Sequence, residues 1–207
     1  MTDDTGTYYS YRTDGPHGLA RNPLKAIVAP RPIAWVSTLS ADGVGNLAPY
    51  SFFNMINDVP PMIMFSSTGY KDSVRNIVAT GEFALSMVSH RLAEGMNITS
   101  ADFPPESDEF DAAGLERFPS VAIRPCGVAG SPAILECRSV VVRQLKDRQG
   151  VAIDSWMVIG EIVAVHLDRT CLADGRFRTE LAVPVLRAGY ADEYWSIGPQ
   201  GKFLMRR

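Results

Sequence analysis

Apolar and β-branched residues occur in short runs along most of this chain, and Gly, Pro, Asn or Asp bounds nearly every run. This pattern is typical of β-strands joined by turns. We expect strands at residues 33–39, 47–55, 62–67, 82–89, 132–145, 151–167 and 181–186. Pro49 predicts an edge or bulge position, because proline cannot donate a hydrogen bond to a neighbouring strand. Asp42-Gly43 and residues 147–150 predict hairpin turns.

Helical spacing of apolar residues is limited to short segments. The strongest example is residues 71–80, followed by Gly81 as a stop signal. Residues 22–28 predict one or two turns capped by Asn22, and residues 91–97 predict a weaker helix. Strands joined mainly by hairpins, with a few short helices, predict a mainly β antiparallel barrel and not alternating β–α–β units.

Two segments fall outside this pattern. Residues 1–21 are polar and rich in tyrosine, so we expect an N-terminal arm that docks on a partner subunit. A single domain at residues 22–207 would follow, because no repeat or linker divides it. Residues 102–119 are acidic and rich in Pro and Gly, and they predict a long excursion of the kind that often carries function.

The composition excludes several functional classes. The 207 residues include 20 Lys and Arg against 23 Asp and Glu, and a net charge of −3 gives no electrostatic footprint for nucleic acid. The acidic N-terminus does not resemble a signal peptide, and no apolar run approaches the roughly 20 residues that cross a bilayer. The three cysteines form no CxxC pair and the three histidines show no metal-site spacing. We therefore expect a cytoplasmic protein with reduced thiols, no metal and no membrane or nucleic-acid partner.

Hydroxyl side chains gather near the ends of three consecutive expected strands and at the start of the helix at 71–80. A helix N-terminus offers free N–H groups and a partial positive charge, and Lys71 adds a full charge there. Together these groups suggest a phosphate site. The alternative is that Asp72 or Ser73 simply caps the helix and that the other hydroxyls belong to turns.

Aromatic residues flank the same region. Tyr50, Phe52 and Phe53 on one strand, and Trp35 on its neighbour, could wall a planar ligand. Ordinary packing of one strand face into the core is the alternative for all of them.

No acid–base set accompanies these aromatic residues. The signatures GxGxxG, GxxxxGK[ST] and GxSxG are absent from the chain. Glu136 lies in an apolar strand, where it could be a buried carboxylate, but we favour a salt bridge at a strand edge or interface. His166 is expected to make a structural hydrogen bond. A protein whose bound cofactor performs the chemistry needs no such set.

Four sequence blocks then occur in a specific order: RPIAWVST at 31–38, NLAPYSFFN at 46–54, PP at 60–61, and KDS with NI at 71–77. Together they resemble the flavin reductase-like, FMN-binding split-barrel family, in particular its flavoredoxin-type members. Weaker matches extend the resemblance to about residue 198, at 96–97, 109–110, 135–137, 159–161, 165–166, 187–190 and Tyr194.

The resemblance implies an antiparallel six-stranded split β-barrel that forms a homodimer, with FMN held non-covalently near the subunit interface. It places flavin contacts at Ser37, Thr38, Ser51, Phe52 and Asn54. It places the phosphate end of the cofactor at Ser66, Ser67, Lys71, Asp72 and Ser73. The excursion at 102–119 is like that of the flavoredoxin-type members.

The function implied is that of a flavin reductase-type oxidoreductase. It would transfer a hydride from NADH or NADPH to FMN and pass electrons to free flavin, a monooxygenase or another acceptor. The first alternative is an FMN-containing electron-transfer protein that does not use NAD(P)H directly. A barrel that binds another ligand, such as haem, is a second alternative. A hydrolase is a third, for which the chain offers no nucleophile motif.

Overall fold

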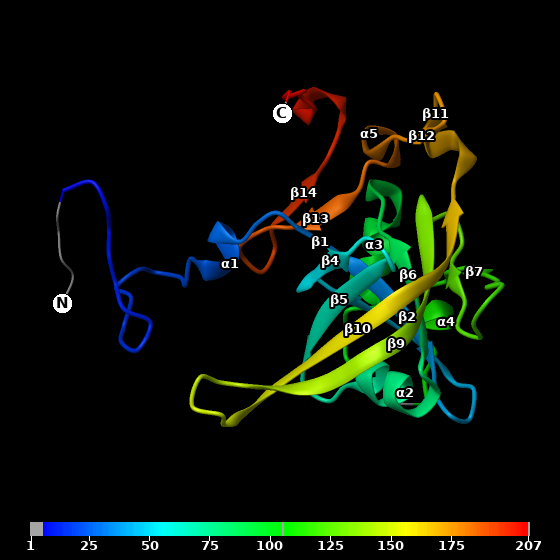
Figure 1. The fold of residues 1–207 in the computed structure, drawn as a ribbon, viewed down its shortest axis with the longest axis horizontal. Coiled ribbons are helices and arrows are strands. Elements are labelled where there is room, and N and C mark those ends of the chain that lie inside the picture. The colour runs from blue at the N-terminus through cyan, green and yellow to red at the C-terminus, as the bar shows by residue number, and fades with distance from the viewer. Residues whose placement is uncertain (1–5, 105, 207) are drawn as a thin grey trace.

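The computed structural model describes residues 6–104 and 106–206, and a curled antiparallel sheet forms its centre (Figure 1). The strand order in this sheet is β3-β2-β6-β9-β10-β5-β4. Its strands are β2 Ala34–Leu39, β3 Gly45–Tyr50, β4 Phe53–Asn57, β5 Met62–Thr68, β6 Glu82–Met87, β9 Ala133–Lys146 and β10 Ala152–Leu167. The predicted mainly β split-barrel class is therefore confirmed, with seven strands in the main sheet in place of six.

The extra strand arises where the sequence predicts one strand at 47–55. The run breaks after Tyr50, and its two halves become β3 and β4 at opposite edges of the sheet. Two strands so close in sequence can occupy opposite edges only if the sheet curls until those edges approach one another. The Ser66 N–H donates to the Phe52 carbonyl at 2.8 Å, which holds the connection against β5. Pro49 lies in edge strand β3, as its missing N–H predicts.

A second, three-stranded sheet covers one end of the barrel. It consists of β1 Arg31–Pro32, β13 Val185–Arg187 and β14 Tyr194–Ser196, and α1 Leu24–Ile27 lies beside it (Figure 1). The remaining short elements are η1 His90–Leu92, α3 Ala93–Ile98, α4 Glu109–Ala112, β7 Arg117–Phe118, β8 Gly127–Val128, η2 Arg169–Cys171, β11 Leu172–Ala173, β12 Arg176–Phe177, α5 Thr179–Ala182 and η3 Pro199–Gly201.

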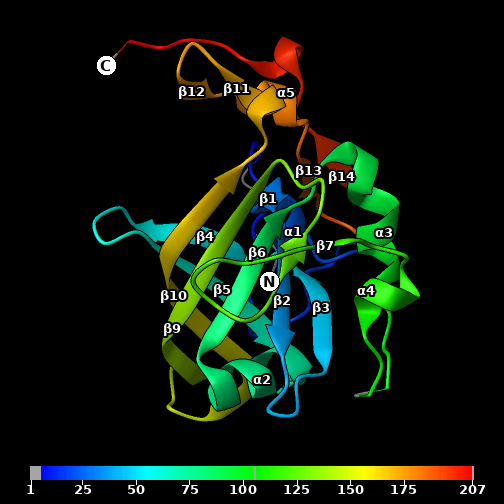
Figure 2. The same ribbon diagram turned by 90° about the vertical axis from the view of Figure 1, so that its right-hand side faces the viewer.

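Helix α2, Asp72–Thr80, lies across the opposite end of the barrel from that sheet (Figure 2). It ends as predicted, since Gly81 has φ +75° and its N–H bonds to the Ile77 carbonyl at 2.8 Å. The N-cap of α1 is Pro23 and not the predicted Asn22, although the Asn22 side chain accepts the Leu24 N–H at 3.0 Å.

The predicted strand at 181–186 is wrong in its first half. Residues up to Ala182 form α5, and the strand begins only at Val185. Val183, with φ +45°, makes the turn between them. The apolar residues continue across both elements in the sequence, and periodicity over so few residues cannot separate a helical turn from a strand.

The core has two parts that lie on the two faces of β2. Val36, Phe65 and Phe83 belong to the cluster inside the barrel. Trp35 is fully buried on the other face, in a cluster with Phe110. Its indole N–H donates to Thr99 Oγ1 at 2.9 Å, so Trp35 anchors the segment that leads into the 102–119 excursion. Ordinary core packing is therefore the correct interpretation of Trp35.

Within the described residues, helices long and apolar enough to cross a membrane are absent. The same residues contain no cluster of three or more His, Cys, Asp or Glu side chains suited to a metal. All three cysteines are free thiols. The described part of the N-terminal arm, residues 6–21, extends away from the barrel (Figure 1); its first five residues lie outside the described range.

Candidate functional site

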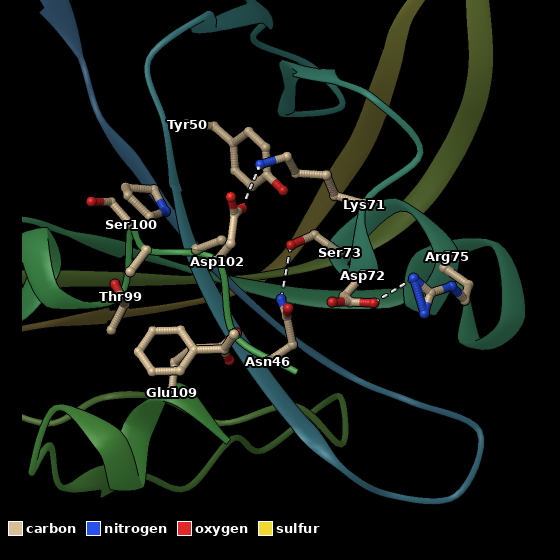
Figure 3. Close-up of a pocket in the computed structure, with 14 residues that line it drawn as sticks. Asn46, Tyr50, Lys71, Asp72, Ser73, Arg75, Thr99, Ser100, Asp102 and Glu109 are labelled. Atoms are coloured by element: carbon tan, nitrogen blue, oxygen red, sulfur yellow. Dashed lines mark hydrogen bonds and ion pairs between the residues drawn. The ribbon is translucent and has the colours of Figure 1, made fainter. Parts of the chain in front are cut away.

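Three adjoining hollows meet at the end of strand β3. They have volumes of about 240, 940 and 270 Å³, and Pro49 and Tyr50 line all three. We call the combined feature the Tyr50 groove. Its smaller end, the Lys71 end, is the 240 Å³ hollow between α2 and the start of the excursion (Figure 3). Its larger end, the Arg187 end, is the 940 Å³ hollow bordered by α1, β5 and β13.

Tyr50 is only 8% exposed, and its ring packs on Phe65 with centroids 4.8 Å apart. Burial raises the pKa of the Tyr50 hydroxyl. The Ser73 and Ser67 hydroxyls lie close enough to act in the opposite direction, but no described residue forms a hydrogen bond of standard geometry with it. A buried, protonated phenol without a partner usually indicates a missing ligand or water. Tyr50 therefore offers a hydrogen bond to whatever fills the groove.

The Lys71 end is built on the start of α2. Lys71 occupies the N-cap position in an extended conformation, and no side chain caps the helix. The interpretation of Asp72 or Ser73 as a simple cap is therefore wrong, and the first N–H groups of α2 have no side-chain acceptor. Ser73 is buried and its hydroxyl accepts from Asn46 Nδ2 at 2.8 Å.

Every cation at the Lys71 end already faces a carboxylate. Lys71 Nζ lies 3.4 Å from Asp102 Oδ1, and Arg75 pairs with Asp72 (Figure 3). Glu109 is a third carboxylate in the lining; it is 7% exposed and accepts the Leu47 N–H at 2.8 Å. Burial raises the pKa of Glu109, and the negative charges of Asp108 and Asp72 add to that shift.

The Arg187 end has a different charge pattern. Its lining includes the cations Arg21, Lys25, Arg31 and Arg187, and no carboxylate among the described lining residues. Phe52 forms part of the wall, and the Lys25 and Arg31 charges each lie 5.8 Å from its ring centroid. This end therefore combines an exposed aromatic face with unneutralised positive charge.

A close approach of two backbone segments shapes this end. The turn after β13 contacts α1 so tightly that a Cβ on Gly189 would overlap Ala26. Arg31 donates to the carbonyls of Lys25, Val28 and Ala188 at 2.5, 2.5 and 2.8 Å, which ties both segments to β1.

Six of the ten predicted site residues line the groove. Lys71, Asp72 and Ser73 line the Lys71 end, whereas Ser51, Phe52 and Ser66 line the Arg187 end. The structure thus brings together two sets of candidates that lie on separate strands and a helix. Their contacts with a cofactor stay predictions.

The other four predicted residues do not line the groove. Ser37 is buried and donates to the Cys126 carbonyl, and Thr38 accepts from Asn76 Nδ2 at 3.0 Å. Ser67 donates to the Gly69 carbonyl at 3.0 Å. Asn54 is exposed and its side chain accepts the Met55 N–H at 2.9 Å. Ser37 and Thr38 tie β2 to neighbouring segments, whereas Ser67 and Asn54 bond only to the backbone next to them. A direct contact with a ligand stays a prediction for all four.

Sequence reasoning missed most of the cations at the Arg187 end. Arg31 and Arg187 are 156 positions apart and meet only because β1 pairs with β13. Arg21 and Lys25 belong to the arm and to α1, which carry no chemical motif. Glu109 was also missed, and only its match to the family block at 109–110 could have indicated it.

Glu136 and His166 lie apart from the groove. Glu136 is fully buried, so the alternative of a buried carboxylate is confirmed and the favoured salt bridge at a strand edge or interface is wrong. Its carboxylate lies 2.6 Å from His166 Nε2 and accepts the Val121 and Ala122 N–H groups at 2.7 and 2.6 Å. Burial pushes the pKa of Glu136 upward, but these three partners outweigh it and hold that pKa below its ordinary value. The structural role expected for His166 is confirmed.

The sequence of this chain is similar to a known protein family and to individual proteins. Residues 28–180 match the profile of the flavin reductase like domain. An uncharacterized protein from Aquifex aeolicus is 37% identical over 151 residues, which cover 70% of this chain and 74% of that protein. An uncharacterized protein from Halalkalibacterium halodurans is 35% identical over 180 residues, which cover 84% of this chain and 85% of that one.

Solved structures agree with the fold. Nitrilotriacetate monooxygenase component B from Bacillus cereus is 27% identical, covering 96% of this chain and 100% of that chain, with a TM-score of 0.83. The 2-nitrobenzoate 2-nitroreductase of Pseudomonas fluorescens is 29% identical, with 88% of each chain covered and a TM-score of 0.78. An FMN-binding protein from Thermus thermophilus shares the fold, with a TM-score of 0.76 at 18% identity.

Proposed function

Because this chain belongs to the family of flavin reductase like domains, we propose that it binds FMN in the Tyr50 groove and oxidises NADH or NADPH. One observation carries the proposal: the buried Tyr50 hydroxyl, without a hydrogen-bond partner among the described residues, lies where the three hollows of the groove meet. A built cavity with an unpaired polar atom at its centre is what a tightly held ligand requires.

The residues of the groove fit FMN. The flavin phosphate needs N–H donors and a cation, which the uncapped start of α2 and Lys71 supply. The flavin ring needs an aromatic or apolar wall with a few polar groups, which Phe52, Ser51 and Ser66 supply at the other end. The 29%-identical nitroreductase and the 27%-identical monooxygenase component support a redox role.

When bound, FMN would supply the two-electron acceptor: a hydride lost from C4 of the nicotinamide donor would leave an oxidised nicotinamide and an anionic reduced flavin. The side chains of this protein move no proton in that scheme. They position the rings and exclude water. The cations of the groove also favour negative charge on a reduced cofactor.

Anaerobic reduction tests the proposal. The purified protein is loaded with FMN, and NADH or NADPH is added while the flavin absorbance is followed. We expect at least one donor to bleach the flavin. If neither donor does so while dithionite does, the protein is an FMN-containing electron-transfer protein that does not use NAD(P)H directly. If the purified protein does not bind FMN, the flavin assignment itself is wrong.

An electron acceptor and a second subunit belong to the same proposal. A monooxygenase or free flavin is the acceptor class that the similarity to a monooxygenase component supports.

Apolar residues on β4 and the turn after it are exposed, which supports a homodimer that covers them. Met55, Ile56 and Val59 are 50%, 46% and 86% exposed. Sedimentation equilibrium should return twice the chain mass, and a monomer at micromolar concentration would exclude the dimer.

A further inference from the structure

Two arginines lie opposite each other where β1 pairs with β13. Arg31 and Arg187 are direct cross-strand neighbours in this antiparallel pair. Like charges in that position destabilise a sheet. Neither guanidinium forms an ion pair with a carboxylate among the described residues, although Arg31 is only 8% exposed. Burial lowers the pKa of Arg31, and the nearby Arg187 charge lowers it further.

Carbonyl groups satisfy these guanidiniums only in part. Arg31 uses Nη1 and Nη2 for three backbone carbonyls, and its Nε has no partner among the described residues. Arg187 donates from Nη2 to the Ala191 carbonyl at 2.6 Å, and its buried Nη1 has no described partner. Two buried N–H donors therefore lack an acceptor at the place where two like charges meet.

The surroundings increase the positive charge. Lys25 and Arg21 line the same hollow, and Arg21 lies 5.6 Å from the ring centroid of Tyr190. Asp192 and Glu193 follow in the same turn but do not line the hollow. Buried charges are normally paired, so this arrangement is complete only when an anion is bound.

We propose that the Arg187 end binds the phosphate groups of the nicotinamide dinucleotide donor. This inference rests on the proposed function. Guanidiniums bind phosphate oxygens through two parallel N–H bonds, and a dinucleotide brings at least two phosphate charges. The Phe52 wall proposed for the flavin ring lies in the same 940 Å³ hollow, so a donor must enter there to reach the ring. The Lys71 end accounts for the single FMN phosphate and leaves the four cations of the Arg187 end for a second anion.

A phosphate-free donor separates this proposal from the flavin chemistry. Anaerobic stopped-flow reduction is measured with NADH, with NADPH and with 1-benzyl-1,4-dihydronicotinamide, on the FMN-loaded wild type and on Arg187→Gln, Lys25→Gln and Arg143→Gln. Arg143 is an exposed β9 residue that does not line the groove. For the better dinucleotide, the second-order rate constant of flavin reduction, divided by that of the phosphate-free donor, should fall about 10- to 100-fold in Arg187→Gln and about threefold in Lys25→Gln. Arg143→Gln should keep the wild-type ratio. Lys25 is exposed, so its variant carries the test if Arg187→Gln does not fold.

Calorimetry gives a readout that does not depend on turnover. Inorganic pyrophosphate is titrated into the FMN-loaded proteins, and its affinity should fall about tenfold in Arg187→Gln. FMN and riboflavin are titrated into the cofactor-free proteins in parallel. If Arg187→Gln weakens FMN binding but not riboflavin binding, this end holds the flavin phosphate and the proposal is overturned. An unchanged donor ratio also overturns it. If no donor reduces the flavin, the phosphate-free one included, the proposed function fails and this inference fails with it.

Discussion

The two ends of the Tyr50 groove differ in how their charges are neutralised. At the Lys71 end, two cations share the lining with three carboxylates, and both cations already lie in ion pairs. At the Arg187 end, four cations line the hollow without a carboxylate among the described lining residues. An anion that enters the Lys71 end must replace an existing partner, whereas one that enters the Arg187 end meets unpaired charge.

This difference separates two ways of building an anion site. The ion pair of Lys71 with Asp102 is solvent-exposed, so it costs little to break and its loss is easily offset by a phosphate. Arg31 is buried and Arg187 is half-buried, and backbone carbonyls hold both side chains, so the two charges stay in place with or without an anion. A cofactor that stays bound suits the first end, and a substrate that comes and goes suits a preformed second end.

The largest effect should come from removing the buried arginine of the Arg187 end. Arg31→Met deletes three hydrogen bonds from a charged donor and leaves three carbonyls without it. We expect the free energy of unfolding to fall by about 2–4 kcal/mol. Urea unfolding measures this free energy. Arg31→Lys keeps the charge but not the forked geometry of the guanidinium, so its stability should lie between those of the wild type and Arg31→Met. An unchanged unfolding midpoint would show that these contacts do not stabilise the protein and that Arg31 does not hold the Arg187 end of the groove together.

The next effect concerns the cation of the Lys71 end. Lys71→Ala should raise the dissociation constant of FMN about tenfold, because a charge-assisted phosphate contact is lost from a partly exposed site. Riboflavin, which has no phosphate, should bind both proteins alike. Fluorescence titration measures both ligands, and Lys146→Ala on the β9 hairpin is a matched control. Equal weakening of FMN and riboflavin would place the phosphate elsewhere.

Glu109 allows a test through pH. Its folded pKa is raised, so folding favours the protonated form. The contribution of this group to stability is full below the unfolded pKa and is lost as the pH rises through the folded pKa. Glu109→Gln keeps an acceptor for the Leu47 N–H and removes the charge. We expect the variant to be about 1 kcal/mol more stable than the wild type at neutral pH, with the difference vanishing toward about pH 4. A constant difference across that range, measured by urea unfolding, would contradict the assigned cause.

The smallest effect concerns the competitor for Lys71. Asp102→Asn removes the carboxylate that faces the Lys71 ammonium. FMN should then bind about twofold more tightly, since an exposed ion pair is weak. The gain should shrink at high salt, where such pairs are screened. Asp42→Asn, in the turn between β2 and β3, does not face Lys71 and serves as the control. Weaker FMN binding in Asp102→Asn would mean that Asp102 positions Lys71 and does not compete for it.

Local sequence patterns predicted most elements but not every boundary. The strands at 33–39, 62–67 and 82–89 and the helix at 71–80 are present because their apolar periodicity and stop signals act within a few residues. The run at 47–55 was read as one strand, and the structure divides it between two edges of the sheet. That division depends on how a seven-stranded sheet curls, which no local pattern records.

The site was predictable to a similar degree. Six of the ten candidates line the groove, because Lys71, Ser51 and their neighbours lie in blocks with a specific family order. Ser37 and Thr38 lie in the same blocks, but both faces of β2 are buried, so their side chains point to opposite faces and meet the Cys126 carbonyl and the Asn76 amide. Sequence order identifies the strand, and only packing decides which side chains of that strand face the ligand.

The sequence by itself determined the fold class, the family and the helix start that offers Lys71, since each depends on residues close together in the chain. Only the tertiary structure decided where unpaired charge gathers. Arg31 and Arg187 become neighbours because β1 and β13 form one short antiparallel pair. Tyr50 is buried, without a hydrogen-bond partner among the described residues, because segments distant in sequence pack around it. The physical reason is that a charge or hydroxyl acquires its chemical role from the partners that folding brings to it or withholds from it, and those partners lie far away in sequence.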